Sequence, residues 1–456
     1  MDKKKYLETL TEQVRYKKSL PLIEKELENH IEEQKADFIA MGMEETEAET
    51  AAVLEMGDPV EVGVDMDRIH RPKSVGKSTG MIAFLYFFCF FLRMMVEMGL
   101  AKNAWASTTP AGLGHITLWS ITDVVFLCLI TFGVCRLDYS RIGKWARELT
   151  VVFSVFMFVV IQTIATVING SQGWLVLGGY TLDLRAVAYL FIPLFGGILY
   201  SYRGQGYLAI GKCLLWMIFP TFLIAHYPSF VTAFLMVMIF LIMLLWAIGN
   251  GWFQVQKKRT MGGILGLMVL FPVVYGAYIW NFGYAYHRQR LQAILTLSNS
   301  EYSFFFESLR TAFLNSRLLG TSEESLQALG TCPGTDLGLA YFISFYGMIP
   351  TAILVGVIVF MLVKLLRSTL RQKNYLGRIM GVGCILAMFV QMIVYVLGNL
   401  GICNLFGGVY CPFISIGSSG TVILAVLFGI VVSIYRYQNV VTDPVAKKWK
   451  LVLKKE

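Results

Sequence analysis

Long apolar runs separated by short polar segments dominate the chain from about residue 80 onward. A helix needs about 20 mostly apolar residues to span a bilayer. Ten such runs are predicted, near residues 80–100, 116–135, 149–168, 186–200, 207–225, 230–249, 261–280, 339–363, 379–398 and 416–435. The weakest division lies between the fifth and sixth runs, where His226, Tyr227 and Pro228 are the only interruption. The pattern predicts an all-α, polytopic membrane protein with about ten transmembrane helices.

The first 72 residues follow a different pattern. The segments KYLETLTEQV and IEKELENHIEEQKADFIAMG carry apolar residues at three- and four-residue spacing, which is typical of amphipathic helices. Residues 1–72 are therefore predicted to form a small helical bundle. A basic linker at 73–79 would join it to the membrane domain at 80–438, and a basic tail follows at 439–456.

Charge supports this division. Only 15% of the residues are charged and 56% are hydrophobic, whereas soluble domains carry about 25% charged residues. Residues 1–72 hold 18 acidic and 10 basic residues, a net charge of −8, and the remainder holds 12 acidic and 29 basic residues, a net charge of +17. A basic body indicates either nucleic-acid binding or basic loops between membrane spans. Because the basic residues lie between apolar runs, we expect membrane loops and no nucleic-acid partner.

The loop charges also predict an orientation. With the N-terminus in the cytosol, the inner loops and tail are basic, and the short outer loops contain Lys102 and almost no other charge. This asymmetry fits the positive-inside rule. The inner basic residues are Arg136, Arg141, Lys144, Arg147, Arg203, Lys257, Lys258, Arg259, Lys364, Arg367, Arg371, Lys373, Arg378, Arg436, Lys447, Lys448, Lys450, Lys454 and Lys455. We therefore expect a multi-pass protein of the cytoplasmic membrane, with both termini cytosolic and a large outer loop at about 281–338.

Motifs of soluble enzymes do not stand out. The chain has no phosphate-cradling Gly-Lys-Ser/Thr loop, no His-Glu-x-x-His and no nucleophile elbow. With five histidines and no close pair, a histidine-based metal site is not expected. Cys403 and Cys411 fall in the last outer loop, and the sequence leaves open whether they form a disulfide.

Motifs in the outer loop and the last spans are the most informative. The chain reads Arg288-Gln-Arg290-Leu at the start of the large outer loop, and Gly334-Thr-Asp336 just before the eighth span. Later it reads Asn399-Leu-Gly401, then Pro412-Phe-Ile-Ser415-Ile-Gly417-Ser418-Ser419. This order and spacing resemble the SEDS family (FtsW, RodA and SpoVE), ten-span glycosyltransferases that polymerise lipid II into peptidoglycan. The resemblance covers roughly residues 80–438, and the last motif is the most specific.

The N-terminal segment resembles another module. The stretch MGMEETEAETAAVLEMGDPVEVG is similar to the permease prefix domain, a small helical module fused ahead of various membrane proteins. We expect a regulatory or partner-docking domain, and the alternative is a solubilising cap without a specific partner.

The resemblance implies roles for particular residues. Asp336 would be the catalytic acid/base, since a carboxylate can take the proton of an attacking sugar hydroxyl; read without the resemblance, an Asp after Pro-Gly-Thr is a turn or helix-cap residue. Arg288 and Arg290 would bind the pyrophosphate, or else contact lipid headgroups as ordinary loop arginines. The other predicted substrate-binding residues are Asn399, Ser415, Gly417, Ser418 and Ser419. Lipid II would be the substrate, a class B penicillin-binding protein the partner, and Mg²⁺ or Mn²⁺ a candidate cofactor.

Several family positions depart from the pattern. The family's Gln-Pro-Ser-Glu falls on Asp183-Leu-Arg185-Ala186, so its Glu is missing, and its Glu-Glu after the catalytic Asp becomes Ser344-Phe345. The acid in the family's Gln-Pro-Asp is replaced by Ser229. Two alternatives therefore stay open: a degenerate relative that scaffolds or regulates cell-wall machinery, and a lipid transporter, although no internal repeat typical of transporters is found.

Overall fold

The computed structural model describes most of the chain. The described residues are 2–17, 19–70, 80, 84, 86–88, 90–92, 94–96, 113–168, 171–177, 180–226, 229–283, 288, 291–292, 301–330, 337–372, 374–402, 410–411, 414 and 418–438.

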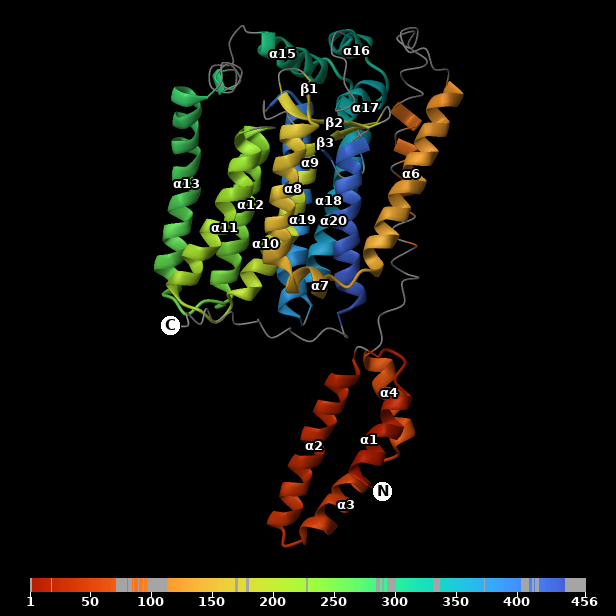
Figure 1. Cartoon of the computed structure of the whole chain (residues 1–456). Helices are drawn as coiled ribbons and strands as arrows, with labels where there is room; N and C mark the ends of the chain where they lie inside the picture. The colour runs from red at the N-terminus through yellow and green to blue at the C-terminus, as the bar shows by residue number, and fades with distance from the viewer. Residues whose placement is uncertain are drawn as a thin grey trace.

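Four helices form an N-terminal bundle, which we call the head: α1 (Lys3–Glu12), α2 (Leu20–Ala40), α3 (Glu45–Glu55) and α4 (Pro59–His70). The apolar residues at helical spacing meet in its core, where Tyr6, Leu10, Ile23 and Ile31 are almost completely buried. On the surface, Lys35 contacts the carboxylates of Glu45 and Glu49 at 3.1 and 3.0 Å and so ties α2 to α3. The head hangs below the membrane domain (Figure 1).

The membrane domain is almost entirely helical. Its elements are α6 (Leu113–Arg136), α7 (Tyr139–Lys144), α8 (Ala146–Thr163), α9 (Leu184–Val187), the 3₁₀ helix η2 (Ala188–Leu190), α10 (Phe191–Ser201), α11 (Tyr207–His226), α12 (Phe230–Gly249), α13 (Lys257–Phe282), α15 (Glu301–Leu314), α16 (Glu323–Leu329), α17 (Gly338–Tyr346), α18 (Met348–Leu370), α19 (Tyr375–Asn399) and α20 (Ser418–Arg436). Seven helical segments among the described residues are long and apolar enough to cross a membrane. Shorter apolar stretches at Tyr86–Val96 and Gly420–Arg436 and the 24-residue α6 match the other predicted spans. The predicted all-α, polytopic membrane architecture is confirmed.

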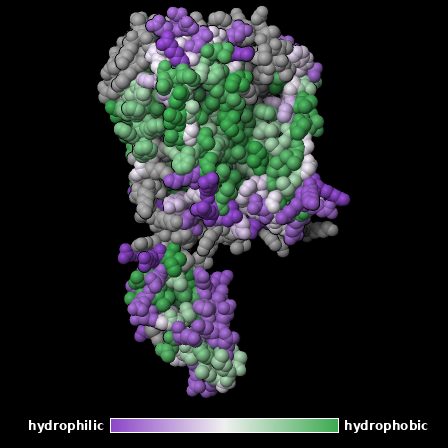
Figure 2. Space-filling model, turned by 180° about the vertical axis from the view of Figure 1, so that it is seen from behind, coloured by the Kyte–Doolittle hydropathy of each residue, from purple (hydrophilic) through white to green (hydrophobic). Residues whose placement is uncertain are grey.

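Hydropathy marks the two ends of this domain. On the face seen in Figure 2, apolar residues form a broad band across it, and hydrophilic residues gather above and below this band. We call the end that faces the head the head side, and the opposite end, which carries the three strands, the hairpin side (Figure 1).

Helix α10 occupies the centre of the domain. It packs against α7, α8, α11, α12 and α19, and 83% of the span Leu184–Ser201 is buried. Glycine makes this packing close, because a Cβ on Gly197 would lie 2.6 Å from the Cβ of Ala146 and one on Gly196 would lie 3.1 Å from the Cα of Met380. The second half of α10 therefore admits no larger residue at these positions.

A three-stranded antiparallel sheet lies between α8 and α9: β1 (Thr166–Ile168), β2 (Ser171–Leu177) and β3 (Tyr180–Asp183), in the order β1-β2-β3. The register pairs Trp174 with Asp183 and Leu175 with Leu182. No strands were expected here, and the third predicted span, 149–168, ends early because α8 stops at Thr163 and β1 follows.

The eighth predicted span, 339–363, is wrong in its boundaries. The chain forms the short helix α17, breaks at Gly347 and continues as α18, whose membrane-crossing segment is Met348–Leu370. Gly347 has a φ of 99°, and a Cβ there would lie 2.7 Å from the carbonyl oxygen of Leu318. A left-handed glycine in close contact with a neighbouring loop ends the first helix, which hydropathy cannot detect.

Candidate functional site

A buried ion pair lies at the hairpin side, where β3 meets α9. The Asp183 side chain is fully buried and accepts the backbone N–H of Arg185 at 2.9 Å, which caps α9. The Arg185 guanidinium contacts the same carboxylate twice, with Nη2 to Oδ2 at 2.7 Å and Nε to Oδ1 at 2.8 Å. Its other face lies 4.8 Å from the centre of the Trp174 ring, on the strand paired with Asp183. A charge at this depth is tolerated because it is paired and hydrogen-bonded.

Tyr410 connects this ion pair to the last outer motif. Its hydroxyl donates a hydrogen bond to Oδ2 of Asp183, across 227 positions of sequence. Its ring fills the space over Gly420, where a Cβ would lie 2.0 Å from the ring. Because Gly420 directly follows Gly417-Ser418-Ser419, the ion pair fixes the first turn of α20 through Tyr410.

The Asn399-Leu-Gly401 motif holds two helices of the outer loop. The Asn399 side chain is 1% exposed, and its Oδ1 accepts the backbone N–H of Ala340 at 3.1 Å, in the first turn of α17. Gly401 has a φ of 66°, and a Cβ there would lie 2.6 Å from the backbone nitrogen of Arg310 in α15. The motif thus fixes α15 and the start of α17, which begins two residues after Asp336 in the sequence.

Other family positions are also structural here. Ser344, which replaces a family acid, is fully buried and shares a 2.6 Å hydrogen bond with Ser325 of α16. Ser229, which replaces another, caps α12 by accepting the backbone N–H of Thr232. The Ser344 hydroxyl therefore joins α17 to α16, and the Ser229 hydroxyl caps the start of its own helix.

Only some of the predicted site residues are among those that the structure describes. Asp336, Arg290, Ser415 and Gly417 lie outside the described residues, as does Cys403. Ser418 and Ser419 open α20, and their side chains are not described. Asn399 is buried between α17 and α19, and its predicted contact with substrate stays a prediction. Cys411 is buried, which raises the pKa of its thiol above the usual range.

Arg288 lies at the hairpin-side end of α13. Its side chain is exposed, and Nε donates to the carbonyl oxygen of Gly283 at 2.9 Å. Gly283 follows the last residue of α13 and also lines an apolar groove. The guanidinium therefore lies next to the end of that groove.

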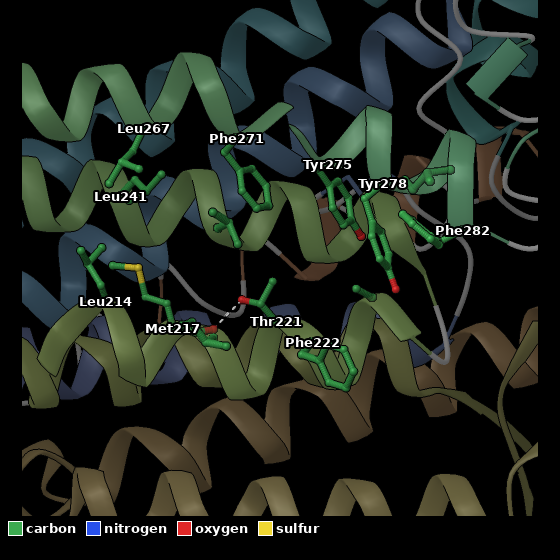
Figure 3. Close-up of a pocket in the computed structure, with 15 residues that line it drawn as sticks. Leu214, Met217, Thr221, Phe222, Leu241, Leu267, Phe271, Tyr275, Tyr278 and Phe282 are labelled. Carbon is green, nitrogen blue, oxygen red and sulfur yellow. Dashed lines mark hydrogen bonds between the residues drawn. The ribbon is translucent and has the colours of Figure 1, made fainter. Parts of the chain in front are cut away.

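The groove runs between α11, α12 and α13 and has a volume of about 700 Å³. Phe271 and Tyr275 of α13 and Met217 and Thr221 of α11 point into the same space (Figure 3). The groove exists because α13 packs against α12 but stands apart from α11 among the described helices. Side chains at its edges, such as Phe222 and Phe282, are 60% and 77% exposed, so the groove opens to the lipid. Such a shape suits an apolar chain that enters sideways from the bilayer.

The described residues offer little to a metal ion. They contain no group of three or more His, Cys, Asp or Glu side chains that could hold one. Asp183 is a poor ligand, because Arg185 and Tyr410 already bond its oxygens. The expectation of Mg²⁺ or Mn²⁺ stays a prediction.

The sequence contained partial signals for the residues that were missed. Asp183 and Arg185 stand two apart at a strand–helix junction, which fits a capping acid with a local partner. Tyr410 and Gly420 carried no signal for their contact, since the pairing joins segments remote in sequence.

This chain is similar in sequence to known proteins. The profile of the FtsW/RodA/SpoVE family, described as "Cell cycle protein", matches residues 79–440. The peptidoglycan glycosyltransferase MrdB of Escherichia coli K12 is 23% identical over 316 residues, which cover 66% of this chain and 80% of MrdB. The MrdB of Shigella flexneri matches to the same extent.

Two solved structures share the fold. One belongs to a peptidoglycan synthase complex that coordinates polymerization and crosslinking; it aligns with a TM-score of 0.60 at 17% identity, over 77% of this chain and 96% of that one. The other is the rod shape determining protein RodA of Thermus thermophilus, with a TM-score of 0.52 at 16% identity, over 78% of this chain and 96% of that one. With the profile covering most of the sequence, this chain belongs to the SEDS (FtsW/RodA/SpoVE) family.

Proposed function

We propose that this protein polymerises lipid II into glycan strands, at the outer face of the cytoplasmic membrane, during cell division, elongation or sporulation. The observation that carries the proposal is the apolar groove with Arg288 at its hairpin-side end. A lipid-linked sugar has an apolar chain, a pyrophosphate and a disaccharide in that order. The groove accommodates the chain, and an arginine beside its end suits the pyrophosphate.

The head side is assigned to the cytosol on charge. Basic residues end or begin the helices there, including Arg136, Lys144, Lys257 and Arg436. An excess of Lys and Arg in short cytoplasmic loops sets the orientation of membrane proteins. The hairpin side, with the groove end and the start of α17, then faces outward, where lipid-linked disaccharides are joined.

The reaction forms one glycosidic bond and breaks one sugar–phosphate bond. The 4-hydroxyl of the acceptor sugar attacks C1 of the donor sugar, and the bond from C1 to the undecaprenyl pyrophosphate breaks with its electron pair on the leaving oxygen. Asp336 accepts the hydroxyl proton as the new bond forms. Arg288 and Arg290 stabilise the negative charge of the leaving pyrophosphate.

Crosslinking would need a partner. The chain has no transpeptidase motif, so we infer that a class B penicillin-binding protein joins it in the membrane. The similarity in fold to a subunit of a peptidoglycan synthase complex supports this inference.

The test is a polymerisation assay with purified lipid II, with and without a co-expressed class B penicillin-binding protein. Asp336→Asn should abolish glycan polymer while leaving the folded protein intact. Thr221→Trp, which fills the groove, should raise the KM for lipid II about tenfold, the equivalent of about 1.4 kcal/mol of lost binding. Leu215→Trp lies on the same helix but faces lipid outside the groove, so it should behave as wild type.

The other readings predict different results. A scaffold or regulator would give no polymer in any pairing, which would contradict the proposal. A lipid transporter would move lipid II between the leaflets of a vesicle without forming polymer. Polymer made at the wild-type rate by the Asp336→Asn variant would overturn the assigned role of Asp336.

A further inference from the structure

Arg436, the last residue of α20, ends on the head side in a fixed position. The hydroxyl of the neighbouring Tyr437 donates to the carbonyl oxygen of Arg136 at 2.9 Å, and Ser433 donates to that of Leu137 at 2.5 Å. Gly429, about two turns before Arg436, would place a Cβ 2.8 Å from Val134. These contacts lock the end of α20 against the end of α6, so the Arg436 side chain emerges from a rigid base.

The guanidinium of Arg436 is bonded less completely than its neighbours on the same side. Its Nε and Nη1 are buried and have no oxygen or nitrogen acceptor among the described residues, and the partner beside the guanidinium is the weakly accepting thiol of Cys135. By contrast, Arg378 donates through Nη2 and Nε to the carbonyl oxygen of Gln372 at 2.5 and 3.1 Å. Arg147 donates to Ser201 at 2.7 and 3.1 Å. A buried charged donor without an acceptor is costly, and a bound anion would remove that cost.

Positive charge accumulates around Arg436. Arg136, at the end of α6, and Arg141, in α7, are exposed cations near it, and neither forms an ion pair with a described residue. The nearby acid is Asp138, whose carboxylate accepts the backbone N–H and the hydroxyl of Ser140 at 3.0 and 2.7 Å. Among the described residues at this junction, Arg136, Arg141 and Arg436 carry three positive charges and Asp138 carries one negative charge.

The head also contacts the end of α20. Tyr16, in the segment between α1 and α2, lies with its ring centre 6.5 Å from that of Tyr437. Asp138, Arg141 and Arg436 all act electrostatically on its hydroxyl, and burial together with Asp138 raises the pKa of Tyr16 to about 12. The phenol therefore stays neutral at physiological pH and retains a proton to donate.

We propose that Arg436, with Arg136 and Arg141, binds a phosphate group at the junction of the head and the membrane domain. The planar fork of a guanidinium matches two phosphate oxygens, and Tyr16 of the head supplies a hydroxyl at the same place. The phosphate belongs either to the headgroup of an anionic lipid in the head-side leaflet or to a small soluble phosphate compound. Basic pockets at the ends of membrane helices bind anionic headgroups in this way.

The experiment uses the full chain reconstituted in nanodiscs of phosphatidylcholine, with or without phosphatidylglycerol. Native mass spectrometry after release into detergent measures retained phosphatidylglycerol, and thermal unfolding in pure phosphatidylcholine measures stabilisation by inorganic phosphate against chloride at equal ionic strength. Arg436→Gln should lower retention or phosphate stabilisation about tenfold, as expected for the loss of a charged hydrogen-bonding partner. Retention of phosphatidylglycerol by the wild type identifies a lipid site, and stabilisation by inorganic phosphate identifies a site for a soluble compound.

Two controls separate a site from general positive charge. Arg259→Gln removes an exposed head-side charge on α13, and Arg378→Gln removes an arginine whose donors are already bonded; both should retain the ligand. If Arg436→Gln does not fold, Arg141→Gln replaces it with the same expectation, because Arg141 lies outside the packed helix ends. Equal binding by wild type and Arg436→Gln, equal losses in all variants, or no binding in either arm would each overturn the proposal.

Discussion

Helices α10 and α13 are both apolar and both contain glycine, two residues in α10 and four in α13, yet they pack in opposite ways. The α10 span has a mean hydropathy of 1.5 and is 83% buried, whereas α13 has a mean hydropathy of 1.9 and is 11% buried. The glycines of α10 touch α7, α8 and α19, while Gly262, Gly263, Gly266 and Gly276 of α13 have no atom within 4 Å of where a Cβ would lie. Composition thus predicts that both helices cross the membrane. The surroundings of the glycines show that α10, and not α13, is closely packed against its neighbours. The groove lies beside α13, the less buried of the two helices.

The two helices also end differently on the hairpin side. The α10 span begins at the buried Asp183–Arg185 pair, and α13 ends at Gly283, where the exposed Arg288 lies. The α10 span thus begins at a buried charge pair, whereas the hydrogen bond of Arg288 at the end of α13 lies on the surface.

The largest effect is expected at the anchored end. Asp183→Ala would leave the Arg185 guanidinium buried without its carboxylate, and removing one partner of a buried pair costs about 3–5 kcal/mol. Thermal unfolding in detergent should show this loss of stability. Arg288→Ala, at the other end, should change stability by less than about 0.5 kcal/mol. Similar losses for the two variants would break the contrast between the helix ends.

A smaller effect is expected inside α10. Gly197→Val would drive a side chain into Ala146 and Gly143, and overpacking a close helix contact costs about 1–3 kcal/mol. Thermal unfolding of the same preparation measures this cost. The companion substitution Ala146→Gly, combined with Gly197→Val, should recover part of the loss because it removes the Cβ that is 2.6 Å away. No recovery in the double variant would show that another contact is responsible.

The smallest effect is expected in α13. Gly266→Ala places a methyl group in open space, and alanine favours a helix over glycine by about 1 kcal/mol or less. Stability should stay the same or rise slightly on thermal unfolding. A clear destabilisation would mean that α13 is packed more closely than its glycines indicate.

Hydropathy and charge predicted the helices and their order, since both depend on local composition. Asn169-Gly170 and Gly178-Gly179 flank β2 and are typical hairpin signals. The sheet was missed because β1 lies inside the apolar run 149–168, which was predicted as the third span. The break at Gly347 depends on the nearby Leu318 carbonyl, which is remote from it in sequence.

The sequence predicted the motifs of the candidate site but not the contacts that hold these motifs in place. Asn399 and Gly401 were found by resemblance, yet their contacts with Ala340 and Arg310 emerge only from the fold. The link from Asp183 through Tyr410 to Gly420 joins three segments that no periodicity connects. Local sequence patterns predict local structure, whereas hydrogen bonds between remote segments can be identified only once the fold is known.

The lipid-facing mouth of the groove has a consequence for inhibitor chemistry. A compound that occupies the space between Thr221 and Tyr275 must first dissolve in the bilayer, so the concentration that matters is the one in the membrane. Potency in cells would then follow the partition coefficient of the compound as closely as its fit to the groove. Assays in detergent, which lack a bilayer to concentrate the compound, would underrate the apolar members of such a series.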